Sequence, residues 1–183
     1  LLASSAASDV YKRQTLLRAG LLKGSFIPDK TFRELRHLTQ YRKSIVRDIT
    51  AQKNRIDKFL QSSGFRFTAF LSDAFGASGQ NIIRHLMEYG NISREALDRC
   101  LKTQTRKRID EILIALNGSL SEHQRGFLRM IFGHLEALEQ HRHTVEDAIT
   151  KEITKHEEAL SLLCSIPGID VTAAAAIIAE IGT

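Results

Sequence analysis

Residues 31–62 read TFRELRHLTQYRKSIVRDITAQKNRIDKFLQS, and their pattern gives the clearest indication of the fold. Its apolar side chains recur at steps of three and four residues, with one step of seven between Ile49 and Ile56. Such spacing places them on one face of a helix. The set comprises Phe32, Leu35, Leu38, Tyr41, Ile45, Ile49, Ile56 and Phe59. We therefore predict an amphipathic helix from Thr31 to about Ser62, with Asp29 as its N-cap.

A second apolar stripe follows Ser121, which we expect to cap a helix running from Glu122 to about Leu163. Its members are Leu128, Ile131, Leu135, Leu138, Val145 and Ile149. At about 1.5 Å per residue this helix would be about 60 Å long, more than one small globule covers. The stripe therefore needs a partner, either residues 31–62 running antiparallel or a second copy of the chain. We predict an all-α fold of long antiparallel coiled-coil helices that forms a homo-oligomer.

The residues between the two long helices, 65–118, are expected to form a small helical insert. It opens with an aromatic cluster made of Phe65, Phe67, Phe70, Leu71 and Phe75. Three short helices are then predicted at Gln80–Tyr89, Arg94–Lys102 and Arg106–Leu116. Ser93 and Thr105 are the expected N-caps of the second and third of these helices.

The segment from Leu162 to Gly182 predicts a helix, a tight Pro-Gly turn and an alanine-rich helix. The turn is similar to a helix-hairpin-helix module, in which exposed backbone N–H groups bind a DNA phosphate without reading the sequence. Its candidate nucleic-acid-binding residues are Ile166, Pro167, Gly168 and Ile169. We expect Gly168 to allow a close backbone approach. An ordinary corner between two helices fits the same pattern.

The opening Leu1–Gln14 has no helical apolar stripe, and we expect a non-native or disordered leader there. A short helix is predicted from Thr15, which Gly20 and Gly24 would weaken and end. No run of 18 apolar residues is present, so the sequence predicts no membrane contact.

Charge is unevenly distributed along the 183 residues, whose formal net charge is +5. Residues 1–60 hold 13 Lys and Arg against 5 Asp and Glu, residues 61–118 hold 8 against 6, and residues 119–183 hold 5 against 10. A basic first third predicts a polyanionic partner, most commonly nucleic acid, although a solvated basic helix carries the same charges. The candidate nucleic-acid-binding residues are Arg33, Arg36, Arg42, Lys43, Lys53 and Arg55.

Residue chemistry gives no catalytic or metal-binding candidate in this chain. His141 and His143 are two residues apart on a helix and so point in nearly opposite directions. The acid pairs Glu146-Asp147 and Glu157-Glu158 are adjacent on a helix, whereas two-metal chemistry needs separated acids held on a common frame. The two cysteines, Cys100 and Cys164, are predicted to be small buried apolar groups.

Several stretches resemble the bridge-RNA-guided transposases of insertion sequences, the one-hundred-and-ten family. They are Leu16-Leu-Arg-Ala-Gly-Leu-Leu22, Phe26-Ile-Pro28, Arg33-Glu-Leu-Arg-His-Leu-Thr-Gln-Tyr-Arg42, Lys53-Asn-Arg-Ile56, Leu163-Cys-Ser-Ile-Pro-Gly-Ile-Asp170 and Ile178-Ala-Glu-Ile-Gly182. The resemblance implies a ribonuclease-H-like domain whose four acids bind a divalent metal such as Mg, then a coiled-coil region, then a domain with a nucleophilic serine. It also implies DNA and a structured guide RNA as partners and a location in the bacterial cytoplasm.

On this resemblance the chain is an internal fragment that is inactive alone. Residues 1–14 would be a leader similar to translated sequencing adapter, 15–30 the tail of the first domain, 31–160 the coiled-coil region and 161–183 the start of the last domain. Asp9 stands near the second position of the family's last Asp-x-x-Asp pair, but Ala6 occupies the first. Because a lone acid cannot build a two-metal site, Asp9 is not a catalytic candidate. The alternative function is a non-catalytic helical scaffold or nucleic-acid-binding adaptor.

Overall fold

The computed structural model describes residues 2–21 and 29–182, and within them every regular element is a helix. The α-helices are α1 (Leu2–Arg18), α2 (Lys30–Ser62), α3 (Ala77–Tyr89), α4 (Arg94–Cys100), α5 (Thr103–Arg106), α6 (Ile109–Ala115), α7 (Glu122–Ile153), α8 (Glu157–Cys164) and α9 (Val171–Ile181). Two short 3₁₀ turns, η1 (Phe67–Phe70) and η2 (Thr154–His156), complete the list. The predicted all-α class is confirmed.

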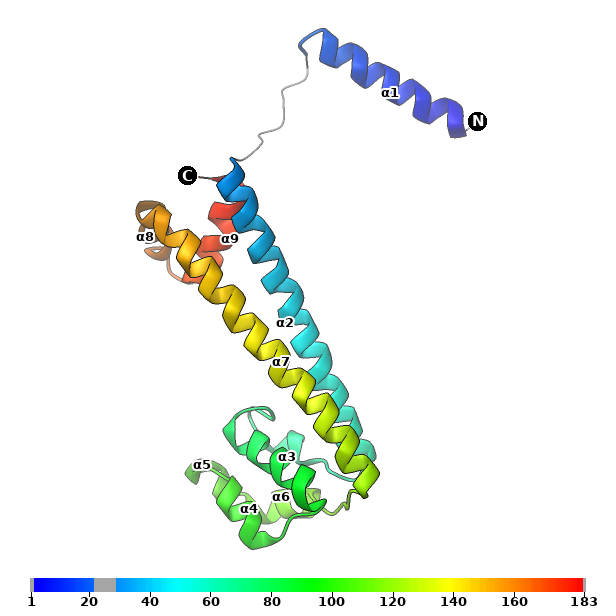
Figure 1. Ribbon diagram of the computed structural model, residues 1–183, viewed down its shortest axis with the longest axis vertical. Coiled ribbons are helices and arrows are strands. Elements are labelled where there is room, and N and C mark those ends of the chain that lie inside the picture. The colour runs from blue at the N-terminus through cyan, green and yellow to red at the C-terminus, as the bar shows by residue number, and fades with distance from the viewer. Residues whose placement is uncertain (1, 22–28, 183) are drawn as a thin grey trace.

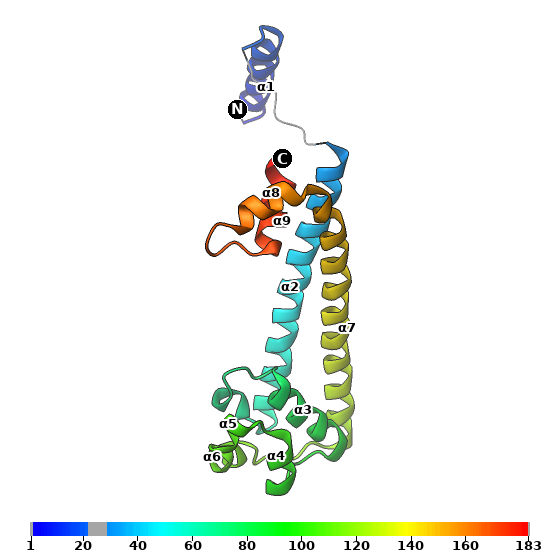
Figure 2. The ribbon, with the colours of Figure 1, turned by 90° about the vertical axis from the view of Figure 1, so that its left-hand side faces the viewer.

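Helices α2 and α7 form an antiparallel hairpin that runs the length of the main body (Figures 1 and 2). With 33 and 32 residues, each helix is about 50 Å long at about 1.5 Å per residue. The buried side chains of α2 are Leu35, Ile45, Ile49, Gln52, Ile56 and Leu60, and those of α7 are Leu128, Phe132, Leu135, Val145, Ile149 and Ile153. Each apolar stripe thus covers the other, as expected if residues 31–62 were the antiparallel partner of the helix that follows Ser121.

The structure corrects two positions of the apolar stripe that was predicted for residues 31–62. Tyr41 is 53% exposed and lies outside the core. Gln52 fills the seven-residue step between Ile49 and Ile56 and is 2% exposed. Its Nε2 donates to the Ile131 carbonyl of α7 at 2.7 Å, and its Oε1 accepts from Arg55 Nη1 at 2.9 Å. A polar residue can occupy this core position because both ends of its amide are hydrogen-bonded.

The insert packs around Phe65 and Phe67, both fully buried, at the lower end of the hairpin (Figure 1). Ser93 caps α4 as predicted, its Oγ accepting from Ala96 N. The helix predicted over Arg106–Leu116 is found as α6, but it begins three residues later, at Ile109, and ends at Ala115. Thr105 is not its N-cap, because it lies in the separate short helix α5 and Arg108 stands at the cap position of α6.

The single helix predicted from Glu122 to about Leu163 is also wrong in its second half, although Ser121 does cap it, with Gln124 completing a capping box. Helix α7 ends at Ile153, and η2 turns the chain into α8. At this turn the His156 ring packs on Phe32 at a centroid distance of 4.8 Å. The turn directs α8 away from α2 and into contact with α9, which itself packs on α2.

Helix α1 begins at Leu2, well before the predicted start at Thr15, although its first residues are rich in both serine and alanine and carry no apolar stripe. Both ribbon views draw it apart from the main body (Figures 1 and 2). Gly20 follows it with φ of +70°, whereas Gly24 lies outside the described residues. Asp29 precedes α2 at the cap position but makes no side-chain cap bond. None of the described helices has the length and apolar character needed to cross a bilayer.

Candidate nucleic-acid interface

The basic residues of α2 separate into an inward-facing group and an outward-facing group. Arg36, Arg42 and Lys53 are half-buried and bind other elements of the fold. Arg42 donates from Nε and Nη2 to Glu146 Oε1 of α7, at 2.9 and 2.7 Å. Lys53 Nζ lies 3.4 Å from Glu139 Oε1 of α7 and 5.6 Å from the centre of the Phe75 ring. These two cations therefore join the two long helices.

Arg36 binds the C-terminal end of α9. Its Nε donates to the Ala179 carbonyl at 3.2 Å, and its Nη2 donates to the Glu180 carbonyl at 2.9 Å. The Glu180 carboxylate lies 3.0 Å from the same Nε. Carbonyls in the last turn of a helix lack partners within that helix, and a cation is favourable at that end. Arg36 thus holds α9 on α2.

The outward group forms a basic stripe along the solvent face of α2. We define the α2 stripe as Arg33, Lys43, Arg47, Arg55 and Lys58. Successive residues turn by about 100° around a helix, so these five positions fall on the side opposite the buried stripe. They span about 38 Å along the axis. Within the described residues, none of the five has an acid within ion-pair distance, unlike Arg36, Arg42 and Lys53.

Two members of the α2 stripe, Arg47 and Lys58, were not among the sequence candidates. Their angular position on the predicted helix was the signal that would have found them, because it places both beside Arg55 and away from the apolar face. Among the described residues, Arg55 is the one stripe member with a hydrogen bond to a neighbouring side chain, that of Gln52. Charge alone could not separate stripe cations from those that bind α7 and α9.

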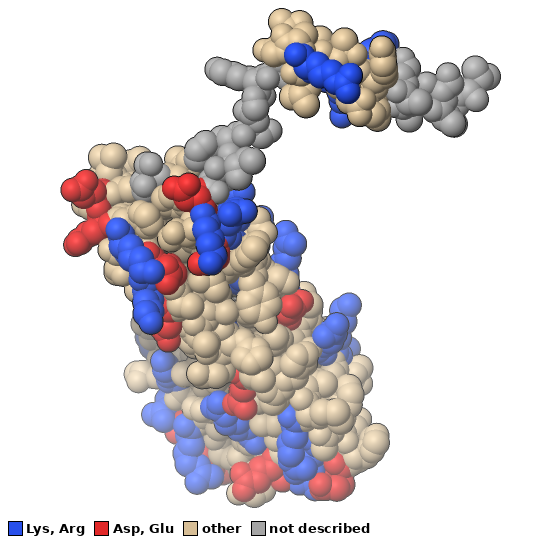
Figure 3. Space-filling view, turned by 45° about the horizontal axis from the view of Figure 1, so that its top comes forward, with Lys and Arg blue, Asp and Glu red and all other residues tan. Residues whose placement is uncertain are grey.

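Elsewhere on the main body, opposite charges alternate. Figure 3 shows Lys and Arg mixed with Asp and Glu over its lower end. Ion pairs in this region include Arg84–Glu136, Arg106–Asp98 and Arg108–Glu111. Because paired surface charges largely cancel at a distance, the α2 stripe is the better candidate for a polyanion.

The Pro-Gly segment forms the tight turn that the sequence predicts. Ile169 N donates to the Ile166 carbonyl at 3.1 Å across Pro167 and Gly168, and Gly168 has φ of +91°, as a type II turn requires. A Cβ on Gly168 would meet no atom of the chain within 4 Å, so no close approach by another part of the chain requires glycine here. Within the fold, the positive φ is what favours glycine at this position.

The turn is exposed and leads into α9 through Asp170, whose Oδ1 accepts from Ala173 N at 2.7 Å. A groove of about 370 Å³ separates this end of α9 from α2, with Lys43 and Asp170 among its lining residues. The structure therefore brings Lys43 of the α2 stripe next to the Pro-Gly turn. The Asp170 carboxylate, however, already occupies the N-terminus of α9. That arrangement is less favourable to a phosphate than an uncapped helix end.

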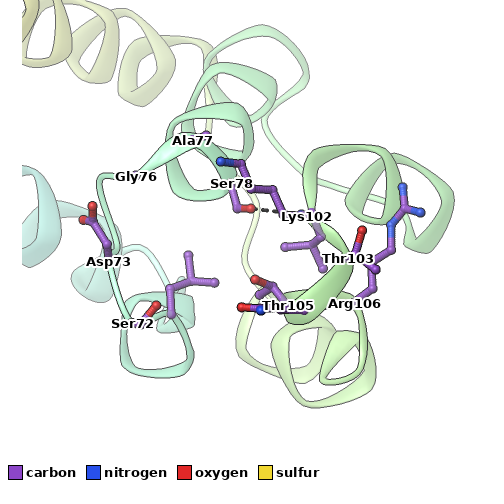
Figure 4. A pocket seen from close by; sticks show the side chains of 12 residues that line it. Ser72, Asp73, Gly76, Ala77, Ser78, Lys102, Thr103, Thr105 and Arg106 are labelled. Atoms are coloured by element: carbon purple, nitrogen blue, oxygen red, sulfur yellow. Dashed lines mark hydrogen bonds between the residues drawn. The ribbon is translucent and has the colours of Figure 1, made fainter.

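A larger cavity, of about 590 Å³, lies in the insert between the 71–78 segment and residues 101–106 (Figure 4). Its hydroxyl group at Ser78 accepts a hydrogen bond from Lys102 N at 3.1 Å, drawn as a dashed line in Figure 4. Arg106 on its rim is bound to Asp98. Because Ser78 and Arg106 are both engaged in contacts within the insert, we assign this cavity no catalytic role.

The described residues also contain no group of three or more His, Cys, Asp or Glu able to hold a metal ion. They do not fit the two-metal acidic centre that the resemblance implies for a full-length protein, and the side chain of Asp9 lies outside what the structure describes. Burial raises the pKa of the Cys100 thiol, so the reactive thiolate is disfavoured there.

Comparison with curated proteins gives no match for this chain. A family model gives one: residues 14–64 match the DEDD transposases of IS110 insertion sequences, a family described as transposase. The matched segment contains all of α2, and with it Arg36, Arg42, Lys53 and the α2 stripe. Over these residues the chain is similar to an IS110 transposase.

Proposed function

We propose that this chain serves DNA transposition as a helical, nucleic-acid-binding part of a transposase, with the α2 stripe contacting the phosphate backbone. The observation that carries the proposal is a row of five cations without acidic partners among the described residues, lying within the segment that matches the transposase family. A free cation keeps its full charge for a phosphate, whereas a paired one must first give up its carboxylate.

The length of the α2 stripe suits a double helix. Its span of about 38 Å is close to one turn of B-DNA, which is about 34–36 Å. Five phosphate contacts would give a slope of about −4.5 for the logarithm of affinity against the logarithm of salt concentration on duplex DNA. Such contacts set position and orientation and carry no base sequence. We propose duplex DNA as the partner of the stripe.

Other features of the parent family remain part of the proposal. They are a structured guide RNA, a divalent metal such as Mg bound by acids of a full-length protein, a homo-oligomer and a bacterial cytoplasmic location. The exposed turn from Ile166 to Ile169 is proposed as a second, weaker backbone contact. Fragment status is likewise proposed from the resemblance.

The test is the salt dependence of duplex binding by charge-reversed chains. We expect Arg47→Glu with Arg55→Glu to abolish measurable binding at moderate salt. The matched control is Lys107→Glu with Lys151→Glu, which makes the same change in net charge at two exposed positions off the stripe. We expect the control to keep a slope near that of the native chain.

Equal loss in both double variants would show a response to net charge alone and would refute the stripe as the binding surface. Salt-insensitive binding by the native chain would refute phosphate contact itself. Either result would favour the alternative, a non-catalytic helical scaffold.

A further inference from the structure

A polar groove of about 590 Å³ lies where α3 meets α4, on the insert and away from the α2 stripe. The last turns of α3 supply His85, Glu88 and Tyr89, the connection supplies Asn91 and Ser93, and α4 supplies Ala96 and Arg99. Nothing in the proposed function uses this groove. Its lining combines an aromatic pair, a carboxylate, an amide and a guanidinium.

The aromatic pair presents an open ring surface. His85 and Tyr89 are one helical turn apart, with ring centroids 4.6 Å apart and planes inclined by 35°. Tyr89 is 59% exposed, so histidine covers part of the ring and solvent reaches the rest. An exposed aromatic ring beside a cation is the surface on which unpaired nucleic-acid bases stack.

The polar groups around the rings suit a nucleotide. Arg99 has no ion-pair partner among the described residues, so its charge is available to a phosphate. Burial, and next the Arg99 charge, lower the pKa of His85, while Glu88 opposes them. The His85 ring is therefore neutral at neutral pH and can support a stacked base without repelling Arg99. Glu88 can accept and Asn91 can both donate and accept hydrogen bonds at a base edge.

The groove is held in place before any ligand arrives. Gly90, at the end of α3, has φ of +80°, and its carbonyl accepts from Leu120 N at 2.8 Å. A Cβ on Gly90 would lie 2.7 Å from the Leu120 carbonyl oxygen, so glycine is required there. From α7, Arg129 Nη2 donates to the Met87 carbonyl at 2.9 Å, which fixes the last turn of α3 on the hairpin. A fixed site loses less entropy on binding.

We propose that this groove binds an unpaired nucleotide of a single-stranded nucleic acid. The base stacks on Tyr89, its edge meets Glu88 and Asn91, and its phosphate lies at Arg99. The inference shares with the proposed function only the class of partner, because it assigns a different surface and a single strand in place of a duplex.

The experiment measures fluorescence anisotropy of the full 183-residue chain with labelled single strands of about 12 nucleotides, within the usual site sizes of such proteins. RNA and DNA of one unstructured sequence are compared with duplex DNA. We expect Tyr89→Ala to weaken single-strand binding between about 5-fold and about 150-fold, the range for loss of one stacked base. Duplex binding stays unchanged, and Tyr89→Phe keeps single-strand affinity.

The matched control is Tyr41→Ala, which removes a tyrosine of similar exposure, 53% against 59%, from α2. Circular dichroism checks that each variant is folded. Single-strand binding that depends on Tyr89 supports the inference, and the comparison of RNA with DNA shows which of the two the groove binds. Equal effects of the two tyrosine variants, or duplex binding with no single-strand binding, overturn the groove and leave the stripe standing. A native chain that binds neither probe overturns both proposals.

Discussion

The two groups of cations on α2 should respond oppositely to the same substitution. Arg42→Ala removes an inward cation and Arg47→Ala removes an outward one, five residues further along the same helix. We expect Arg42→Ala to destabilise the fold without changing the salt dependence of DNA binding. We expect Arg47→Ala to lower that salt dependence without changing stability.

The size of the Arg42 effect follows from its contacts. Two of its N–H groups bind one Glu146 oxygen, at 2.9 and 2.7 Å, and the two side chains are 24% and 28% exposed. A hydrogen bond to a charged group contributes about 1.5–3 kcal/mol, and partial exposure reduces that to about 1–2 kcal/mol. For a chain of this length the melting temperature should fall by about 2–8 °C.

Arg47 has no such contact with any described residue, so its replacement should change the free energy of unfolding by less than about 0.5 kcal/mol. Loss of one phosphate contact should reduce the salt slope on duplex DNA by about 0.9. Urea unfolding followed by circular dichroism gives the stability, and anisotropy titrations at several salt concentrations give the slope.

Glu146→Gln is the control for the Arg42 prediction, since it should destabilise the hairpin in the same way from the other side. The reasoning is refuted if Arg42→Ala lowers the salt slope while stability is unchanged. It is equally refuted if Arg47→Ala destabilises the chain as much as Arg42→Ala does.

Two further predictions concern the packing of the fold. Gln52→Ala should lower the free energy of unfolding, measured in urea, by about 2–4 kcal/mol because it opens a cavity and removes the hydrogen bond to the Ile131 carbonyl. Gln52→Leu refills the space and should change that free energy by less than about 1 kcal/mol. Equal losses of stability in the two variants would contradict this role of Gln52. Gly79→Ala should prevent native folding, because a Cβ there would lie 1.9 Å from the Ala74 carbonyl oxygen, while Gly133→Ala, which meets no atom within 4 Å, should keep or raise the melting temperature.

The periodic spacing of apolar residues was enough to predict the two long helices. The apolar spacing in 31–62 and from Ser121 onward predicted the two long helices and their antiparallel pairing, because a stripe tens of ångströms long must be covered. Helix boundaries that no periodic pattern marks were predicted less well. The break after Ile153 has no proline or glycine to mark it, and the start of α6 at Ile109 has no capping side chain to mark it.

Helix period and net charge are local properties, so an all-helical chain with a basic first third could be predicted from the residues alone. Which of the described cations are paired depends on contacts that form only when the chain folds. Glu139, Glu146 and Glu180 lie far along the chain from Lys53, Arg42 and Arg36, and folding brings each acid to its cation. The α2 stripe keeps its charge because its side of the helix faces solvent. Tertiary packing likewise formed the groove at Tyr89, since His85 and Arg99 come from different helices.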